Sequence, residues 1–377
     1  MQLRLITAAG LLLSASAPAL AVQHYKLTEL TTGSAPRTIS NAGMIAGEIG
    51  PLAGRLDDGS ASFALPTGYT SEQARGISGI GRTALIIQGG GNDLAGIGFA
   101  NGSVTYLAPL AGDAAAGAYG IYNGKFVGYS LTSGTLLGAA GNPALNALAA
   151  GTLHAAVWNG FAAATALANP FGSGNSIATA VNFNGIVGGT VLDNSRRQRG
   201  VTWAADGTAT VLGLQSGQSS SLVRDINESG DALGRTSGTA GTLATVWSQG
   251  QVYTLAGLAG SSESNGRGIN DRGVAVGFGI SGTDGSTQGM YWAFNGTGYD
   301  SYSLDSLVDN LNGWQTGAAQ SINDDGTIVG FGTRADGSSG AYILTAVPEP
   351  ASWAMMVAGF GFVGACARRR VQGAVPA

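Results

Sequence analysis

A short phrase recurs along most of this chain and constrains how the chain can fold. Its clearest copies read INDDGTIVG, INDRGVAVG and INESGDALG, and weaker copies read ISNAGMIAG, IYNGKFVG, VNFNGIVG and ISGIGRTAL. We call the residue after the opening Ile or Val the anchor. The anchors, in chain order, are Ser40, Ser78, Tyr122, Asn182, Asn227, Asn270 and Asn323. Their spacing of about 45 residues is typical of repeat architectures.

Each phrase has the composition of a tight hairpin. A β-branched residue ends one strand, Asn or Ser then opens a turn, and Gly three positions later closes it. These are the residue preferences of a type I turn. An apolar run follows as the return strand. The phrase therefore predicts two paired strands in every repeat.

An aromatic residue follows the anchor in every repeat, and a second turn and a final strand come after it. The aromatic residues are Phe63, Phe99, Trp158, Trp203, Trp247, Trp292 and Tyr342, with Trp158 displaced by an insertion. Each repeat thus holds four short strands in about 45 residues, which is the pattern of β-propeller blades. We interpret the aromatic residues as packing between blades.

The two ends of the repeat region complement each other. The last repeat stops at AYILTAV without a final strand, whereas the region begins with HYKLTEL, which matches the final strand VYTLAGL of another repeat. Pairing of the two ends would remove an exposed sheet edge. We predict an all-β fold, a β-propeller of about seven four-stranded blades closed by the N-terminal strand, over residues 22–346. Six blades remain the alternative if the weak copy at Ser78 is not a blade.

The first residues have the features of a secretory signal. Arg4 precedes an apolar run, and Ala19-Leu20-Ala21 forms a small-x-small cleavage site. We predict a signal helix over residues 1–21, removed after export through the Sec translocation machinery. An uncleaved anchor is the alternative, but the run is shorter than the ~20 residues that a membrane span needs.

The C-terminal stretch VPEPASWAMMVAGFGFVGACARRR contains an uncharged run over residues 351–367 that ends at three arginines. It closely resembles the PEP-CTERM sorting segment of Gram-negative bacteria. The resemblance implies a transmembrane helix within residues 347–371, a short tail over 372–377 and removal of the segment by a membrane-embedded exosortase. It assigns the sorting motif to Pro348, Glu349, Pro350, Trp353, Arg368, Arg369 and Arg370. The protein would be anchored transiently in the inner membrane and then reach the cell surface or the extracellular space.

A second resemblance concerns the repeat itself. The phrase INDDGTIVG, together with HAAVWNG at residues 154–160, resembles the extracellular HAF repeat. This resemblance implies a secreted β-repeat protein and brings no catalytic residues with it.

Residues that could perform catalysis or bind a metal are scarce. The histidines are His24 and His154, and Cys366 lies in the sorting segment. No Gly-x-Ser-x-Gly motif and no zinc-type spacing occurs. The stretch Asp225–Asp231 partly imitates a calcium loop without its distal Glu, which leaves calcium open. We predict no catalytic residue, no metal and no cofactor, and a net charge of −4 argues against nucleic acid as a partner.

Four arginines, Arg37, Arg75, Arg224 and Arg267, each stand three positions before an anchor. Equivalent positions of a closed ring lie on one circle, so these side chains would face one rim or the central channel. They would bind an anionic ligand such as an acidic exopolysaccharide. The alternative is local pairing with carboxylates or carbonyls of neighbouring blades.

Together these features favour a non-catalytic surface or matrix protein linked to exopolysaccharide or biofilm. The alternative is a secreted propeller enzyme that acts on glycans as a lyase or hydrolase. Such an enzyme would need carboxylates or a histidine converging at one face of the ring.

Overall fold

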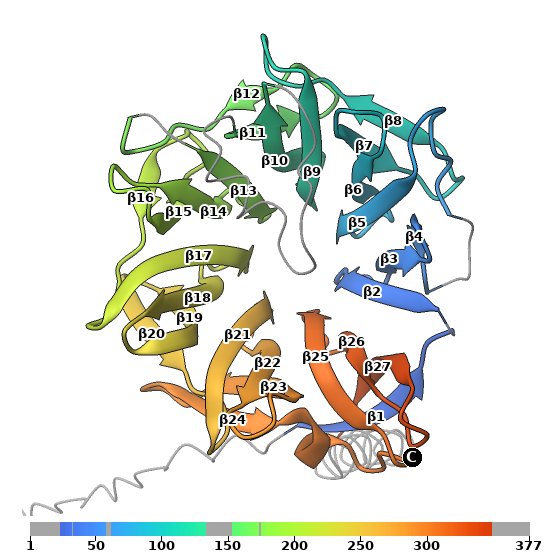
Figure 1. Cartoon of the computed structure of the whole chain (residues 1–377), viewed down its shortest axis with the longest axis vertical. Coiled ribbons are helices and arrows are strands. Elements are labelled where there is room, and N and C mark those ends of the chain that lie inside the picture. The colour runs from blue at the N-terminus through green and yellow to red at the C-terminus, as the bar shows by residue number, and fades with distance from the viewer. Residues whose placement is uncertain (1–22, 32, 58–61, 133–152, 173–174, 349–377) are drawn as a thin grey trace, which may run out of the picture.

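The computed structural model describes residues 23–31, 33–57, 62–132, 153–172 and 175–348. These residues form seven antiparallel sheets that surround a central axis like the blades of a wheel (Figure 1). The seven-bladed propeller predicted from the repeat is therefore confirmed, and the weak copy at Ser78 belongs to a full blade. The predicted signal helix and transmembrane helix lie outside the described residues.

Each blade begins at the centre of the ring and proceeds outward (Figure 1). We number the blades 1 to 7 by their innermost strands, which are β2 (Ser34–Ile39), β5 (Ser71–Ile77), β9 (Ala115–Tyr122), β13 (Ser176–Val181), β17 (Gln218–Ile226), β21 (Ser261–Ile269) and β25 (Gln315–Ile322). The second strands are β3 (Ile45–Ile49), β6 (Thr83–Gln88), β10 (Lys125–Leu131), β14 (Val187–Leu192), β18 (Ala232–Gly238), β22 (Ala275–Ser281) and β26 (Ile328–Thr333).

The third strands are β4 (Leu52–Arg55), β7 (Leu94–Gly98), β11 (Leu153–Asn159), β15 (Gln198–Trp203), β19 (Gly241–Ser248), β23 (Thr287–Phe294) and β27 (Ser339–Val347). The outer strands are β8 (Val104–Leu107), β12 (Thr165–Ala166), β16 (Ala209–Val211), β20 (Gln251–Leu255), β24 (Tyr299–Ser303) and, for blade 7, β1 (His24–Glu29). The 3-10 helix η1 (Leu304–Leu307) follows β24.

Blade 1 departs from the predicted four strands. Its sheet contains β2, β3 and β4 only, among the residues that the structure describes. The backbone N–H of Phe63 donates to the carbonyl of Ala53 at 3.0 Å, so an irregular stretch runs beside β4 where the other blades have a regular outer strand.

The ring closes as predicted. Strand β1 pairs antiparallel with β27, from His24 opposite Val347 to Glu29 opposite Tyr342. The first strand of the body therefore completes the last blade and covers the edge that β27 would otherwise expose. Tyr25 is buried in this sheet and its ring lies 6.2 Å from that of Tyr291 in blade 6.

The anchor turns lie at the ends of the innermost strands and join neighbouring blades. The Asn270 side-chain oxygen accepts the backbone N–H of Val274 at 3.0 Å within its own turn, and its Nδ2 donates to the Asn323 carbonyl of the next blade at 3.1 Å. Asn182, Asn227 and Asn323 make the same inter-blade contact, to the carbonyls of Asn227, Asn270 and Ser40. We call the face of the ring that carries these turns the turn face.

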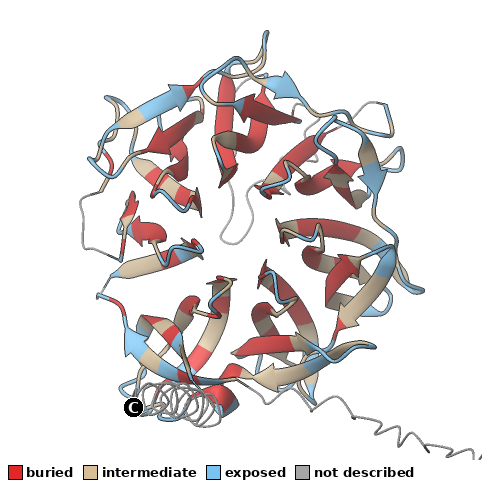
Figure 2. Cartoon of the chain, turned by 180° about the vertical axis from the view of Figure 1, so that it is seen from behind, coloured by how far each residue is buried: buried red, intermediate tan, exposed pale blue. Residues whose placement is uncertain are grey.

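The hydrophobic core is distributed between blades. Apolar residues of neighbouring blades share clusters, as Val127 and Trp203 do across blades 3 and 4. Figure 2 shows buried residues along the inner strands and exposed residues along the outer ones. The indole N–H groups of four tryptophans each donate at 2.7 Å to a carbonyl that follows the last strand of the preceding blade; they are Trp158, Trp203, Trp247 and Trp292. Inter-blade packing of these aromatics agrees with the interpretation from the sequence.

Candidate functional site

A cavity of about 580 Å³ lies on the axis of the ring and is lined by residues of all seven innermost strands and their turns. We call it the central cavity. Its lining extends from the residue three positions before each anchor to the turn residues that follow the anchor. The turns form its mouth, which opens on the turn face, and the residues three positions before the anchors form its deepest ring.

A β-bulge in every innermost strand determines what that deepest ring contains. In every blade, pairing with the second strand skips the residue three positions before the anchor; these residues are Arg37, Arg75, Tyr119, Thr179, Arg224, Arg267 and Gln320. Blades 5, 6 and 7 have a further irregularity nearer the start of the innermost strand. A bulge leaves its extra residue unpaired and redirects the side chain. All seven of these residues line the central cavity. We call them the bulge ring.

The four arginines predicted from the sequence therefore share one cavity. Sequence reasoning missed the bulge itself, and it missed Tyr119, Thr179 and Gln320 as members of the same ring. Superposing the repeats on their anchors would have found these three residues, because they occupy the same column as the arginines. The residue types at these seven positions differ from blade to blade, so they do not indicate that the strand bulges there.

The arginines of the ring differ in their partners. The Nε of Arg37 lies 2.6 Å from Glu48 Oε2 in an ion pair, which is the local pairing that the alternative interpretation expects. Arg75 donates to the side-chain oxygen of Gln73 and lies over the ring of Tyr119, 5.4 Å from its centroid. The Nε atoms of Arg75 and Arg267 are buried without a hydrogen-bond partner.

Arg224 and Arg267 lie in an unusual electrostatic environment. Burial, followed by the neighbouring charge of Arg267, lowers the pKa of Arg224 to about 9. Burial and the neighbouring charge of Arg235 lower the pKa of Arg267 to about 10. Among the described residues no ion pair joins Arg75, Arg224 or Arg267 to a carboxylate. Arg224 and Arg267 are both partly exposed in the structure, and a cation without a charged partner costs more free energy the more it is buried.

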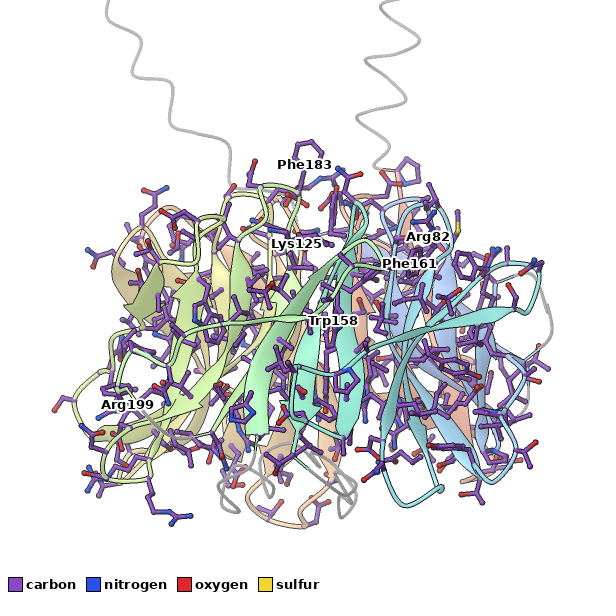
Figure 3. All side chains as sticks on the ribbon, turned by 90° about the horizontal axis from the view of Figure 1, so that it is seen from above. Arg82, Lys125, Trp158, Phe161, Phe183 and Arg199 are labelled. Carbon is purple, nitrogen blue, oxygen red and sulfur yellow. The ribbon has the colours of Figure 1, made fainter. Side chains whose placement is uncertain are left out.

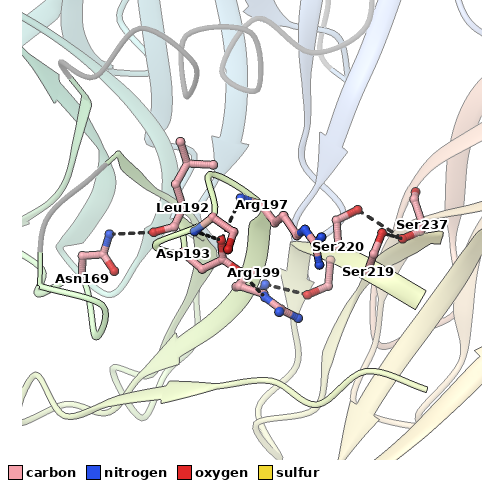
Figure 4. A network of polar contacts seen from close by, with 11 residues as sticks. Asn169, Leu192, Asp193, Arg197, Arg199, Ser219, Ser220 and Ser237 are labelled. Atoms are coloured by element: carbon pink, nitrogen blue, oxygen red, sulfur yellow. Dashed lines mark hydrogen bonds and ion pairs between the residues drawn. The ribbon is translucent and has the colours of Figure 1, made fainter. Parts of the chain in front are cut away.

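An arginine at the opposite end of a blade shows the usual arrangement. The Nε of Arg199, in β15, donates to Asp193 Oδ2 at 3.0 Å (Figure 4). Asp193 in turn accepts the backbone N–H of Arg197, and the side chains of Arg199 and Asp193 are 25% and 10% exposed. Arg199 lies away from the turn face (Figure 3), and its charge is compensated within its own blade.

The residues directly after the anchors lie at the mouth of the cavity, and in blades 5, 6 and 7 they are acidic: Glu228, Asp271 and Asp324. The backbone N–H of Asp271 donates to Asp324 Oδ1 at 2.8 Å, and that of Glu228 donates to Asp271 Oδ1 at 2.7 Å. Asn41 and Phe183 continue this chain of contacts at its two ends. Burial raises the pKa of the Glu228 carboxyl. Burial and the neighbouring Asp324 raise that of Asp271. The acidic half of this mouth was not predicted.

Asp225, next to Arg224 in the chain, also lines the cavity. Its carboxylate accepts the backbone N–H groups of Ile226 and of Ile269 in the next blade, both at 2.9 Å. Burial raises its pKa to about 6. In the calcium-like stretch, Asp231 accepts from Asn227 Nδ2 at 3.0 Å. Within the described ranges no group of three or more His, Cys, Asp or Glu side chains is arranged to hold a metal ion.

The two histidines lie outside the cavity lining. His24 Nδ1 contacts Asp309 Oδ1 at 2.9 Å beside β1, and His154 Nδ1 contacts Asp113 Oδ2 at 3.1 Å on blade 3. The lining that the structure describes contains Asp225, Glu228, Asp271 and Asp324 but no histidine.

Of the predicted sorting motif, only Pro348 belongs to the described part of the chain, directly after β27. Glu349, Pro350, Trp353, Arg368, Arg369 and Arg370 lie outside it, as does Cys366. None of the helices in the described ranges has the length and apolar character to span a bilayer.

Comparison with known proteins supports the sorting motif and the fold. The family model described as PEP-CTERM protein-sorting motif matches residues 346–370. That motif implies an exported cell-surface protein that is processed by exosortase. No curated protein matches the sequence.

Among solved structures, the chain is similar to virginiamycin B lyase from Staphylococcus aureus, with a TM-score of 0.51 and 12% identity over 86% of this chain and 99% of that one. It is also similar to a structure from a study of two prolyl endopeptidases, with a TM-score of 0.50 and 9% identity. That match covers 87% of this chain, which spans about half (51%) of the endopeptidase chain. At such identities the likeness shows the fold alone.

Proposed function

We propose that this protein is a surface or extracellular matrix component, sorted by exosortase, whose propeller binds an anionic ligand in the central cavity without catalysing its conversion. An acidic exopolysaccharide is the ligand class that fits an exported protein with this cavity, and a role in biofilm follows from that ligand. The resemblance of the repeats to the HAF family supports a secreted protein in the same way. Nucleic acid is not part of the proposal.

The observation that carries this proposal is the pair Arg224 and Arg267. Both guanidinium groups lie in the deepest ring of the cavity, and both have a pKa lowered by burial. The fold maintains these charges without carboxylate partners among the described residues. A ligand carboxylate could accept two parallel hydrogen bonds from one guanidinium, and it would supply the missing compensation.

Substitution of the two arginines tests the proposal. We expect Arg224→Met and Arg267→Met each to weaken binding of uronic-acid oligosaccharides by roughly 10- to 100-fold, since a hydrogen bond to a charged group contributes about 1.5–3 kcal/mol. The measurement is isothermal titration calorimetry at low salt. Arg199→Met is the matched control, because Arg199 is compensated by Asp193 outside the cavity.

Stability measured on the same variants separates a binding role from a structural one. Removing an uncompensated buried charge should leave the free energy of unfolding unchanged or raise it, whereas removing a structural ion pair should lower it. Unaltered affinity in both cavity variants would contradict the proposal, and so would a loss of stability in parallel with affinity.

A glycan lyase or hydrolase is the second candidate, and Asp225 is the observation in its favour. A carboxyl with a pKa of about 6 in the same cavity as Arg224 has the properties of a general acid or base. However, both of its oxygens accept backbone N–H groups, which favours a role in joining blades 5 and 6. Shorter oligosaccharide products after prolonged incubation, lost in Asp225→Asn, would favour the enzyme.

A further inference from the structure

The chain leaves the propeller on the turn face. Strand β27 runs toward that face, and Val347 lies three residues beyond Leu344, which pairs with Ile328 at the start of β26. A Cβ built on Gly326, in the turn of anchor Asn323, would lie 3.9 Å from the Cβ of Ala346. The sorting segment therefore begins beside the turns that form the mouth of the central cavity.

The link between the propeller and the apolar run is short. Three residues, Pro-Glu-Pro, separate Val347 from the uncharged run that starts at Ala351. Three fully extended residues span only ~10 Å. If the run lies in the membrane, as its composition predicts, a tether of this length holds the turn face close to the bilayer surface.

The turn face carries large apolar side chains that suit this position. Ile80 and Phe183, in the turns of blades 2 and 4, are 70% and 61% exposed. Phe161 is 50% exposed and follows Gly160, whose N–H donates to the carbonyl of Gly124 in the turn of blade 3. Figure 3 shows Phe183 projecting at this face, and Phe161, Lys125 and Arg82 in the half of the ring next to it. Phe and other large apolar side chains bury at the boundary between lipid headgroups and acyl chains.

The same face also carries features that oppose stable membrane binding. Glu228, Asp271 and Asp324 surround part of the cavity mouth, and an anionic lipid surface repels carboxylates. The few apolar side chains next to these carboxylates would contact the bilayer as long as the sorting segment remains attached. Since these few side chains lie beside carboxylates, we expect the face to separate from the bilayer once the tether is cut.

We propose that the turn face is the membrane-facing surface of the anchored precursor, and that removal of the sorting segment uncovers the mouth of the central cavity. Sorting would then be an unmasking step as well as a release step. A bulky ligand that enters the cavity through this mouth is excluded until the cut is made. This inference rests on the predicted membrane run, and it holds whichever ligand the cavity binds.

Cysteine labelling at the two ends of one strand tests the inference. Ser229 lies in the turn of blade 5, and Ser216 precedes β17 at the opposite face; both are exposed. Single variants Ser229→Cys and Ser216→Cys are made in a full-length chain whose natural thiol is removed by Cys366→Ser. The rate of reaction with a large maleimide is measured with the protein held in phospholipid vesicles.

Two comparison samples show whether the tether is responsible. One is a full-length variant with about 20 Gly/Ser residues inserted after Pro348, which span roughly 25 Å on average. The other is the processed form recovered from cells with an active sorting protease. We expect the thiol introduced at position 229 of the vesicle-bound chain to react at least tenfold more slowly than in either comparison sample, and the thiol at position 216 to react at one rate in all three.

Each other outcome overturns the inference. Equal rates at position 229 in the vesicle-bound and spacer-extended chains would show that the mouth is already open on the membrane. Slow labelling at position 229 in the processed form would show that the cut uncovers nothing. Slow labelling at position 216 in vesicles would place the opposite face against the bilayer. None of these outcomes depends on whether the arginines bind an anion.

Discussion

At the scale of single residues, the anchor asparagines perform two tasks that a serine performs only in part. The carbonyl oxygen of each amide accepts an N–H of its own turn, and the amide nitrogen donates to the next blade. At Ser40 and Ser78 the hydroxyl accepts only the turn contact, from Met44 and Arg82. The copies of the phrase with an asparagine anchor, VNFNGIVG included, are thus the ones whose anchor side chain joins two blades.

Glu72, in β5, is a residue whose charge state affects stability. Its side chain is 1% exposed, and both carboxyl oxygens are buried without a hydrogen-bond partner. Burial raises its pKa to about 7, and a backbone contact with Ala53 lowers it only in part. Since the folded pKa is above the unfolded value of 4.5, the folded state binds the proton more tightly. The contribution is fully present below that value and is lost as the pH rises through about 7.

We therefore expect Glu72→Gln to flatten the pH dependence of stability. The wild-type chain should lose about 1–3 kcal/mol more of its unfolding free energy than the variant between pH 5 and pH 8, because only the wild type must ionise a buried carboxyl. Urea unfolding at several pH values measures this difference. Parallel pH curves for the two proteins would show that Glu72 is not the group responsible. Burial also raises the pKa of Asp225, so Asp225 contributes a pH dependence of stability in the same direction. The effect of Glu72 is therefore read from the difference between the wild type and the variant.

At the scale of the strand pair, the bulge explains the glycine that ends the repeat phrase. A Cβ on Gly277 would lie 2.0 Å from the Asn265 carbonyl oxygen, and a Cβ on Gly234 would lie 1.9 Å from that of Leu222. Both glycines face the segment of the innermost strand that leads into the bulge. Gly47 and Gly128 have the same close contact. Blade 2 carries Leu85 at this position, and nothing in the structure explains how it is accommodated.

Gly277→Ala should therefore destabilise the protein by about 1–3 kcal/mol, the usual cost of overpacking. Gly298→Ala is the control, since a Cβ there would have nothing within 4 Å, and surface changes usually stay within about 0.5 kcal/mol. Thermal unfolding of both variants measures the difference. A neutral Gly277→Ala would indicate that the strands separate easily at the bulge, and that the bulge does not fix the side chains of the bulge ring.

These strand-level features also show what the sequence could and could not predict. Hairpin turns follow from local chemistry, since Asn, Gly and β-branched residues specify them within nine residues. The pairing of β1 with the last blade was predictable because HYKLTEL matches the final strand VYTLAGL of another repeat. The bulge was not predictable. It depends on how the backbones of two strands pair, and no particular residue type is required at the bulged position. The acidic mouth was missed because the residue after the anchor varies from copy to copy.

At the scale of the whole molecule, one strand joins the two ends of the body. Tyr25 is 1% exposed and belongs to the cluster that also contains Tyr291, Tyr342 and Leu344. The backbone carbonyl of Tyr25 additionally accepts the N–H of Asp309, which follows η1. The closing strand is therefore held by side chains of blades 6 and 7 as well as by its ladder with β27.

We expect Tyr25→Ala to lower the free energy of unfolding by about 3–5 kcal/mol, as for other large aromatic residues removed from a core. Lys26→Ala, an exposed neighbour in the same strand, should change it little. Chemical denaturation gives both values. If the two variants were equally stable, the strand would be held by its backbone alone, and closure would not depend on the aromatic cluster.

The pairing of His24 with Val347 also has a consequence for timing. When a chain crosses a membrane with its N-terminus leading, β1 emerges first, yet its partner β27 emerges last. Blade 7 cannot assemble until almost the whole propeller domain has crossed the membrane. The ring of blades therefore closes only after translocation of the domain is complete. Contacts between segments so distant in the sequence form slowly. A partly translocated chain therefore has an unclosed propeller, and a closed propeller indicates that translocation is complete.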